Sequence, residues 1–174
     1  PLTVQQDAQE FWTLLLPAVG SERLTDLYKG FYEDYVIALD GSGRERRRDE
    51  LFLDLSVDVS ATSDLVDSLL ASFGKPELLS AKDGNGWRPE KGSEKVDAHK
   101  GSSLIAKALP SILQFHLKRF DYNWETGSIS KLNQQFTFPQ NLNLGSVCKE
   151  DGNKKLEVNY DLQSIIMHVG RFDV

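Results

Sequence analysis

Two carboxylates near the start of the chain are spaced so that they can act together. Asp7 and Glu10 are three residues apart, so a helix would present both from one face. Thr3 and Gln6 fit a capping box at the helix start, where negative charge also complements the helix dipole. On these grounds alone the pair is equally well explained as a helix-start feature or as an acidic site for a basic ligand.

A second group of polar side chains lies in the tract Leu113–Phe120, which reads as a central sheet strand ending in a cation and an aromatic ring. His116 falls in the middle of this strand, where a hydrogen-bonded histidine is expected. Arg119 could be a strand-end cation whose aliphatic stem covers the sheet. The other reading is that Arg119 and Phe120 form a wall of a binding channel.

Cys148 and His168 are the remaining candidates, as a nucleophile and its base. Cys148 is the one cysteine and stands in a polar connector, so the sequence predicts an incidental thiol. His168 ends a predicted strand and is expected to be structural, and His99 is expected in an exposed loop. A single cysteine excludes an internal disulfide and a multi-cysteine zinc cage. Because no disulfide is expected, a reducing compartment, cytoplasmic or nuclear, is expected for the protein.

Composition narrows the function further. The 174 residues carry a formal net charge of -6, with 40% hydrophobic and 26% charged residues, which suits one folded domain or a large part of one. Nucleic acid is not expected as a partner because it needs an excess of cations, whereas a basic partner fits. No membrane is expected either, since no apolar run approaches the ~18 residues of a span. The start lacks Met and signal-peptide features, so the chain is expected to begin inside a longer protein or to have been trimmed.

The elements that must position these side chains form an α+β pattern. A helix is predicted over Thr3–Leu16, ended by Pro17 and Gly20. Period-two alternation predicts one strand over Leu51–Val59, and Ser63 is predicted to cap the helix that follows. Before this strand, a short helix passing into a strand (24–36), a turn (40–43) and a charged solvated fingertip turn (44–50) are predicted. A polar loop or abbreviated strand pair is predicted over 82–100. Three further strands (111–120, 136–139, 160–169) are predicted, with a turn (123–128) and a polar connector (146–155) between them.

Three segments then resemble one family. They are Gln5-Gln6-Asp7-Ala8-Gln9-Glu10-Phe11; the tract Leu109-Pro110-Ser111-Ile112-Leu113-Gln114-Phe115-His116-Leu117-Lys118-Arg119-Phe120 with Asp97–Lys100 before it; and Phe136-Thr137-Phe138-Pro139 followed by Tyr160–Leu162 and Ile165–Gly170. In this order they resemble the catalytic domain of ubiquitin-specific proteases, over nearly the whole chain.

The resemblance implies a papain-like cysteine protease fold with thumb, palm and fingers, present here incompletely. Residues 1–174 would be the central part of one catalytic domain, with a thumb helix remnant in 1–27 and fingers and palm in 28–174. Such enzymes use a cysteine thiolate, with histidine as base, to cleave the bond after the terminal glycine of ubiquitin.

The family's catalytic positions are expected to lie outside these residues. Its Cys box precedes the Gln-Gln-Asp segment, and its Gly-His-Tyr box follows the strand that ends in His168, so no catalytic residue is assigned. Many members bind zinc through two Cys-x-x-Cys pairs in the fingers. The corresponding segments here, Ala38–Gly41 and Trp87–Glu90, hold no cysteine, so neither a metal nor another cofactor is predicted.

The resemblance also implies a substrate site. Ubiquitin has an arginine-rich C-terminal tail, which acidic groups beside the cleft would pair with. The assigned substrate-binding residues are Gln6, Asp7, Gln9, Glu10, Arg119 and Phe120. The turn Asp121–Ser130 would match a mobile loop over the tail channel.

The predicted function is therefore part of a deubiquitinating cysteine protease, whose partners are ubiquitin and ubiquitinated proteins. This part would keep the tail-binding surface and be inactive alone. Two alternatives stay open: a non-catalytic ubiquitin-binding relative, and an interaction domain that reuses the fold without ubiquitin.

Overall fold

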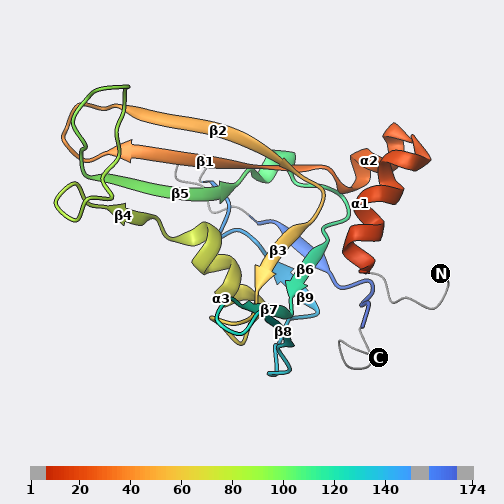
Figure 1. Cartoon of the computed structure of the whole chain (residues 1–174). Coiled ribbons are helices and arrows are strands. Elements are labelled where there is room, and N and C mark those ends of the chain that lie inside the picture. Colours follow the sequence, from red (N-terminus) through yellow and green to blue (C-terminus); the bar gives the residue numbers. More distant parts are fainter. Residues whose placement is uncertain (1–6, 150–156, 168–174) are drawn as a thin grey trace.

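The computed structural model describes residues 7–149 and 157–167 and confirms the mixed α+β architecture (Figure 1). The elements are α1 (Ala8–Val19), α2 (Glu22–Tyr28), β1 (Gly30–Ala38), β2 (Glu45–Phe52), β3 (Leu55–Asp58), α3 (Leu65–Leu69), the π-helical turn η1 (Leu70–Gly74), β4 (Glu77–Leu79), β5 (Ala98–Leu104), the 3-10 turn η2 (Ala106–Ala108), β6 (Phe115–Lys118), β7 (Phe120–Asn123), β8 (Ser128–Lys131), β9 (Asn141–Asn143) and β10 (Asn159–Asp161). In the described part of the chain, no helix is long and apolar enough to cross a membrane.

Helix α1 starts at a different cap from the one predicted. Asp7 is the N-cap residue, and the predicted Thr3–Gln6 box lies outside the described residues. Pro17 does not end the helix, because in the last turn its missing N–H removes only one hydrogen bond. Gly20 ends it, with the left-handed φ of 66° that a C-cap glycine accepts.

The longest strands form an extended antiparallel sheet of order β2-β1-β5-β4, which projects from the rest of the molecule (Figure 1). The predicted turn at Asp40–Gly43 joins β1 to β2. The charged run Arg44–Glu50 was predicted as a fingertip turn, and this is wrong, because it forms most of β2. A polar sequence suffices there since β2 is an edge strand with mostly exposed residues. His99, predicted in a loop, lies exposed in β5.

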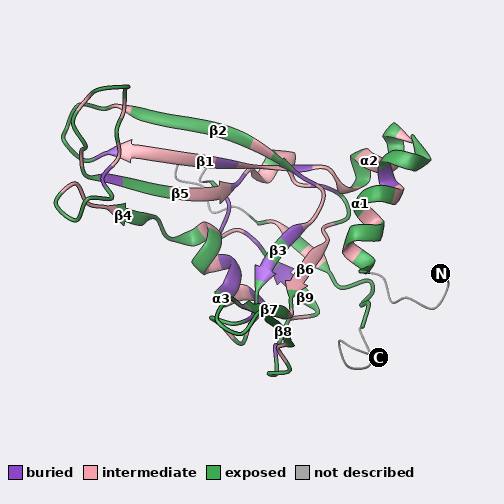
Figure 2. Ribbon diagram, viewed as in Figure 1, coloured by how far each residue is buried: buried purple, intermediate pink, exposed green. Residues whose placement is uncertain are grey.

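The hydrophobic core surrounds the parallel pair β3–β6, between the projecting sheet and α3 (Figure 2). The predicted single strand Leu51–Val59 is interrupted at Leu53–Asp54, and the interruption reverses which residues face inward. Phe52 is therefore buried and Leu51 exposed before the break. After it, the inward residues are those predicted: Leu55, Val57 and Val59.

Helix α3 follows the loop after β3, as predicted, and is five residues long. Its N-cap is Asp64 rather than Ser63, with Oδ1 accepting the N–H of Val66 at 2.7 Å. Leu65 and Leu69 are buried, and the chain continues into η1 up to Gly74.

Three of the predicted strands differ from the structure. The strand predicted over 111–120 is divided into β6 and β7 at Arg119. The segment 136–139 forms one isolated bridge, from Thr137 to Asp64. The strand predicted over 160–169 is limited, within the described residues, to β10, while Ile165–Met167 are unpaired and exposed.

Candidate functional site

The first part of the candidate site is the N-terminus of α1. Asp7 Oδ1 accepts the backbone N–H groups of Gln9 at 2.7 Å and Glu10 at 3.2 Å, so this carboxylate is fixed at the helix start. Glu10 is exposed in the first turn of α1. Gln6 lies outside the described residues.

Gln9 connects this helix to the residues that precede β3. Its side-chain Nε2 donates to Asp54 Oδ2 at 3.2 Å, across 45 residues of sequence. Asp54 is half-buried at the break that precedes β3 and adds a third carboxylate near the helix start. Sequence reasoning missed Asp54, because the alternating pattern presented it as one more outward position of an unbroken strand.

The second part of the site lies where β6 ends. Arg119 Nη1 donates to the backbone carbonyls of Leu132 at 3.2 Å and Gln134 at 3.0 Å. Arg119 therefore holds together the base of the β7–β8 hairpin. Phe120 begins β7 with 42% of its surface exposed.

The two parts lie at opposite ends of the β3–β6 pair and do not form one cluster. Leu55 N donates to Gln114 O at 2.9 Å beside Asp54, while the far end of the pair is Asp58 with Lys118. The paired segment is four residues long, or roughly 13 Å at the usual rise per residue. An extended ligand of about that length could contact both parts at once, whereas a compact ligand could not.

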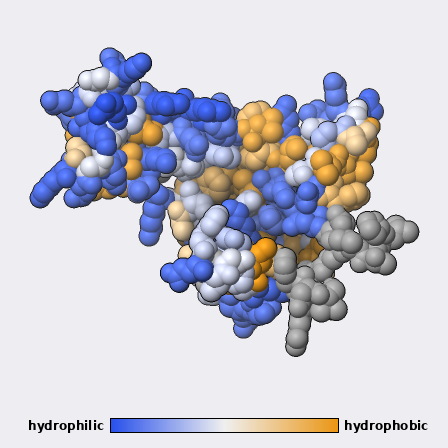
Figure 3. Space-filling view, viewed as in Figure 1, coloured by the Kyte–Doolittle hydropathy of each residue, from blue (hydrophilic) through white to orange (hydrophobic). Residues whose placement is uncertain are grey.

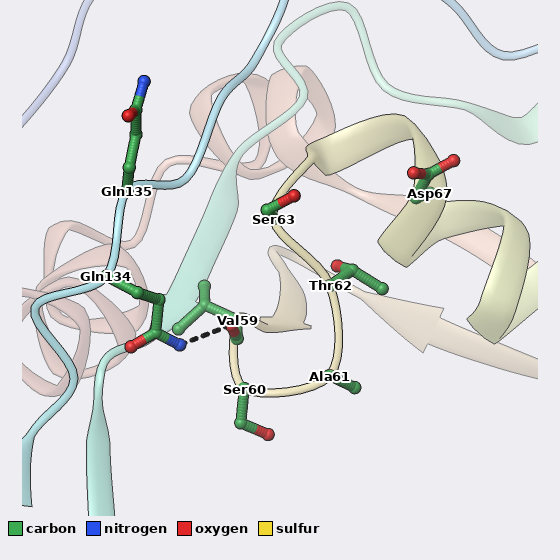
Figure 4. A pocket seen from close by; sticks show the side chains of 8 residues that line it. All are labelled: Val59, Ser60, Ala61, Thr62, Ser63, Asp67, Gln134 and Gln135. Atoms are coloured by element: carbon green, nitrogen blue, oxygen red, sulfur yellow. Dashed lines mark hydrogen bonds between the residues drawn. The ribbon is translucent and has the colours of Figure 1, made fainter.

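A pocket of about 540 Å³ lies beside the Arg119 end of the pair (Figure 4). The loop 59–63, Asp67 of α3 and the segment Gln134–Gln135 line it. Gln134 Nε2 donates to the carbonyl of Val59 at 2.7 Å and so ties the two lining segments together. The lining is rich in hydroxyl and amide groups, which suit contacts with peptide backbone.

The thiol of Cys148 is unsuited to nucleophilic attack. It was predicted in a polar connector, but it is buried, with 7% of its surface exposed. It is buried because its neighbours bond to β5: Leu104 N donates to Val147 O at 3.0 Å, and Lys149 N donates to Leu104 O at 2.7 Å. Burial raises the pKa of Cys148 to about 11, so the reactive thiolate is scarce at neutral pH. The proposed partner His168 lies outside the described residues, and His116 is half-buried in β6.

The two segments expected at the family's zinc-binding positions, Ala38–Gly41 and Trp87–Glu90, each bond to the stretch Val96–Asp97. Leu39 N donates to Asp97 O at 2.8 Å, and Trp87 and Val96 exchange both backbone hydrogen bonds at 2.9 and 2.8 Å. Within residues 7–149 and 157–167, no group of three or more His, Cys, Asp or Glu side chains could hold a metal ion.

Comparisons with known proteins show the family of this chain. The family model described as "Ubiquitin carboxyl-terminal hydrolase" matches residues 2–173. "Ubiquitin carboxyl-terminal hydrolase 47" of Drosophila melanogaster is 36% identical over 163 residues, which is 86% of this chain and 10% of that protein. "Ubiquitin carboxyl-terminal hydrolase 9Y" of Homo sapiens is 36% identical over 152 residues, which is 83% of this chain and 6% of that protein.

Among solved structures, one chain of the SAGA Ubp8/Sgf11/Sus1/Sgf73 DUB module bound to ubiquitin aldehyde superimposes with a TM-score of 0.78 at 27% identity. The match covers 95% of this chain and 39% of that chain. The chain belongs to the ubiquitin carboxyl-terminal hydrolase family, and its fold is the papain-like one of ubiquitin-specific protease catalytic domains, as predicted. It spans a tenth or less of the length of the two curated relatives above.

Proposed function

We propose that this chain is the central part of a deubiquitinase catalytic domain and binds the C-terminal tail of ubiquitin. In the whole protein, that domain would hydrolyse the bond after ubiquitin's terminal glycine, using a cysteine, a histidine and an Asp or Asn outside these residues. Residues 1–27 would contribute a thumb helix, and residues 28–174 the fingers and palm. The match of this chain to 39% of a chain of the SAGA Ubp8/Sgf11/Sus1/Sgf73 DUB module supports the reading that it is one part of a larger domain.

The observation that carries the proposal is the Gln9–Asp54 hydrogen bond, which sets the acidic start of α1 beside the first residue of the β3–β6 pair. Asp7, Glu10 and Asp54 would there face the arginine side chains of the tail, and such charge-assisted hydrogen bonds are the stronger kind. Gln6 and Gln9 would help to orient the tail. At the other end, Phe120 would contact it directly, and Arg119 would act by holding the hairpin base.

The chain by itself would perform no hydrolysis. Its one thiol, that of Cys148, is buried and has a raised pKa, so it cannot serve as the nucleophile. A non-catalytic ubiquitin-binding protein of the same family would share this surface. The sequence flanking the chain in the full gene distinguishes the two, since only the enzyme needs a Cys before α1 and a His after β10.

Titration with ubiquitin and with a peptide of its C-terminal tail tests the proposal. We expect saturable binding of both, weakening as salt is raised, because the contacts with the tail are ionic. We also expect no covalent adduct with an electrophilic ubiquitin probe. Absence of binding at high micromolar concentration would favour the interaction-domain alternative, and an adduct at Cys148 would contradict the assignment of this thiol as non-catalytic.

A further inference from the structure

Strand β2 (Glu45–Phe52) is a long free edge of the projecting sheet. It stands first in the strand order β2-β1-β5-β4, and Figure 1 shows it along the outer side of that sheet. Among the strands of the described residues it pairs with β1 only. Its residues from Glu45 to Asp49 are exposed, and so is Leu51. A free edge of this kind presents unpaired backbone groups on which another chain can pair.

The backbone groups of every second residue of β2 point away from β1. Ala38 N donates to Arg44 O at 2.9 Å just before β2, and opposite residues of an antiparallel pair alternate between hydrogen-bonded and non-hydrogen-bonded positions. The even-numbered residues of β2 are therefore the ones that bond to β1. The outward N–H and C=O groups belong to the alternate residues from Glu45 to Leu51, where they are available to a further strand.

The charges along β2 are complementary to those of an antiparallel copy of the same strand. Arg46, Arg47 and Arg48 are followed by Asp49 and Glu50. If Arg48 lies opposite Arg48 of a second copy, Arg46 faces Glu50 and Arg47 faces Asp49, each twice by symmetry. Opposite charges directly across a sheet stabilise the pairing. The one like-charge contact is that of Arg48 with its copy, and Arg48 Nε already lies 2.8 Å from Glu50 Oε1 of its own strand.

The neighbouring registers match the charges less well. Directly opposite residues share a face of a continuous sheet, so the second copy can slip only in steps of two residues. A slip in one direction sets Asp49 opposite its own copy and leaves Arg48 with Glu50 as the one kind of opposite-charge pair. A slip in the other direction sets Arg46 opposite Arg48, which are both cations. The charge pattern therefore selects the register centred on Arg48.

Charged residues on an edge strand often serve to prevent pairing, and this is the other explanation for the composition of β2. That protection depends on an unfavourable charge meeting the second strand, and it fails where the second strand brings the opposite charge. The other edge of the sheet, β4, is only three residues long. Pairing through β2 would therefore stop at two copies, because short edge strands resist further pairing.

We propose that two copies of this chain associate edge to edge through β2 and form one continuous antiparallel sheet across a two-fold axis at Arg48. The paired stretch, Glu45–Leu51, is roughly 23 Å long at the usual rise per residue. It would add about eight main-chain hydrogen bonds, because each hydrogen-bonded pair of residues exchanges two. A contact of this size makes a weak dimer. The inference goes beyond the proposed function and does not depend on ubiquitin binding.

Charge-reversal variants test the proposal, with sedimentation equilibrium as the measurement of self-association. Arg46→Glu sets two acidic side chains across each contact between positions 46 and 50, and Glu50→Arg sets two basic ones there. We expect either variant to weaken the dimer at least about 10-fold, because two cross-strand attractions become repulsions. Glu77→Arg makes the same charge change at an exposed residue of the other edge strand, β4, and should leave the dimer unchanged.

Mixing the two variants gives a test that does not depend on losing affinity. In a mixed pair, one copy carries only acidic side chains at positions 46 and 50 and the other only basic ones, so both contacts are complementary again. We therefore expect an equimolar mixture of Arg46→Glu and Glu50→Arg to form heterodimers of about wild-type affinity. The double variant Arg46→Glu/Glu50→Arg should dimerise with itself. Neither rescue is expected if the substitutions merely damage the sheet.

Amide hydrogen exchange locates the contact on β2. The outward N–H groups, at alternate residues from Glu45 to Leu51, should exchange more slowly as the protein concentration rises, because pairing protects them. The N–H groups of the residues between them already bond to β1 and should change much less. Raising the salt concentration should weaken the dimer, since the opposed charges are screened.

Three results would overturn the proposal. The first is a wild-type chain that remains monomeric at about 1 mM, where even a weak dimer would form. The second is a dimer that both charge reversals leave unchanged, or a mixture of the two folded variants that fails to associate. The third is an association that persists in high salt and is lost in Leu14→Glu, since Leu14 is an exposed apolar residue of α1 and not of β2.

Discussion

At the scale of single residues, Asp7 combines a structural and an electrostatic role. Its Oδ1 caps α1 through the N–H groups of Gln9 and Glu10, and its charge is available at the same helix end. Either role would account for an aspartate here. The two roles can be separated because an asparagine side chain caps a helix about as well as aspartate but carries no charge.

We predict that Asp7→Asn leaves the free energy of unfolding nearly unchanged and weakens the binding of the ubiquitin tail peptide. Asp7→Ala should lose about 0.5–2 kcal/mol of stability as well, since Ala cannot cap. Urea unfolding and peptide titration give the two quantities. Equal peptide affinity for wild type and Asp7→Asn would leave Asp7 as a cap only.

At the scale of elements, a buried carboxylate joins two strands of the projecting sheet to the segment that carries Cys148. Glu33 of β1 is 6% exposed. It accepts from Arg47 Nη1 of β2 at 2.6 Å and from Lys149 Nζ at 2.8 Å. Burial acts to raise the pKa of Glu33, but the hydrogen bonds from Lys149 and Arg47 outweigh it, so the pKa lies below its usual value of 4.5.

We predict that Glu33→Gln removes part of the acid sensitivity of this chain. A lowered pKa in the folded state stabilises the fold above pH 4.5, and this stabilisation is lost as the pH falls through the lowered value. At pH 7, Glu33→Gln should cost about 1.5–3 kcal/mol, towards the low end because both cations are partly exposed. Urea midpoints between pH 7 and pH 3 measure the effect.

Glu45→Gln provides a control, since Glu45 contacts the same Arg47 from an exposed position at 3.0 Å. It should change stability much less at pH 7. If wild type and Glu33→Gln lost stability in parallel on acidification, other carboxylates would account for the acid sensitivity.

At the scale of the whole molecule, apolar side chains gather over α1 and α2, on the opposite side from the hydrophilic tip of the projecting sheet (Figure 3). Leu14 is 68% exposed and Phe11 is 58% exposed. Trp12 and Leu15 of the same helix are half-buried, and Trp12 packs against Tyr28 at 4.7 Å between ring centroids. Exposed apolar patches of this kind promote association.

We predict that the chain associates as its concentration rises and that Leu14→Glu reduces the association. The melting temperature should change little, because Leu14 contributes little buried area. Light scattering and thermal melts follow the two effects. Thr13→Glu adds the same charge at an exposed neighbouring position and should reduce association less than Leu14→Glu does. A wild-type chain that stays monomeric and melts cooperatively at high temperature would contradict the prediction.

The sequence by itself determined the family and the α+β class, because both depend on local information. The motifs around Gln6–Glu10 and Leu113–Phe120 can be read in order, and so can the capping residues, the turn at Asp40–Gly43 and the alternation of Leu55, Val57 and Val59. Helix and strand periods are properties of adjacent residues, so α1, β3 and α3 were predicted in the right order even though their ends were displaced.

Only the tertiary structure decided the contacts between distant segments. The break at Leu53–Asp54, the burial of Cys148 against β5, and the strand formed by the charged run in β2 all depend on neighbours far away in sequence. A period of two cannot show where a strand changes its partner, and a polar context cannot show that a thiol is covered. The sequence could name Gln9 and Arg119 as site residues, but it could not show their contacts with distant segments. Only the structure shows that Gln9 bonds Asp54. Likewise, only the structure shows that Arg119 holds the base of the hairpin on which Trp124 is exposed.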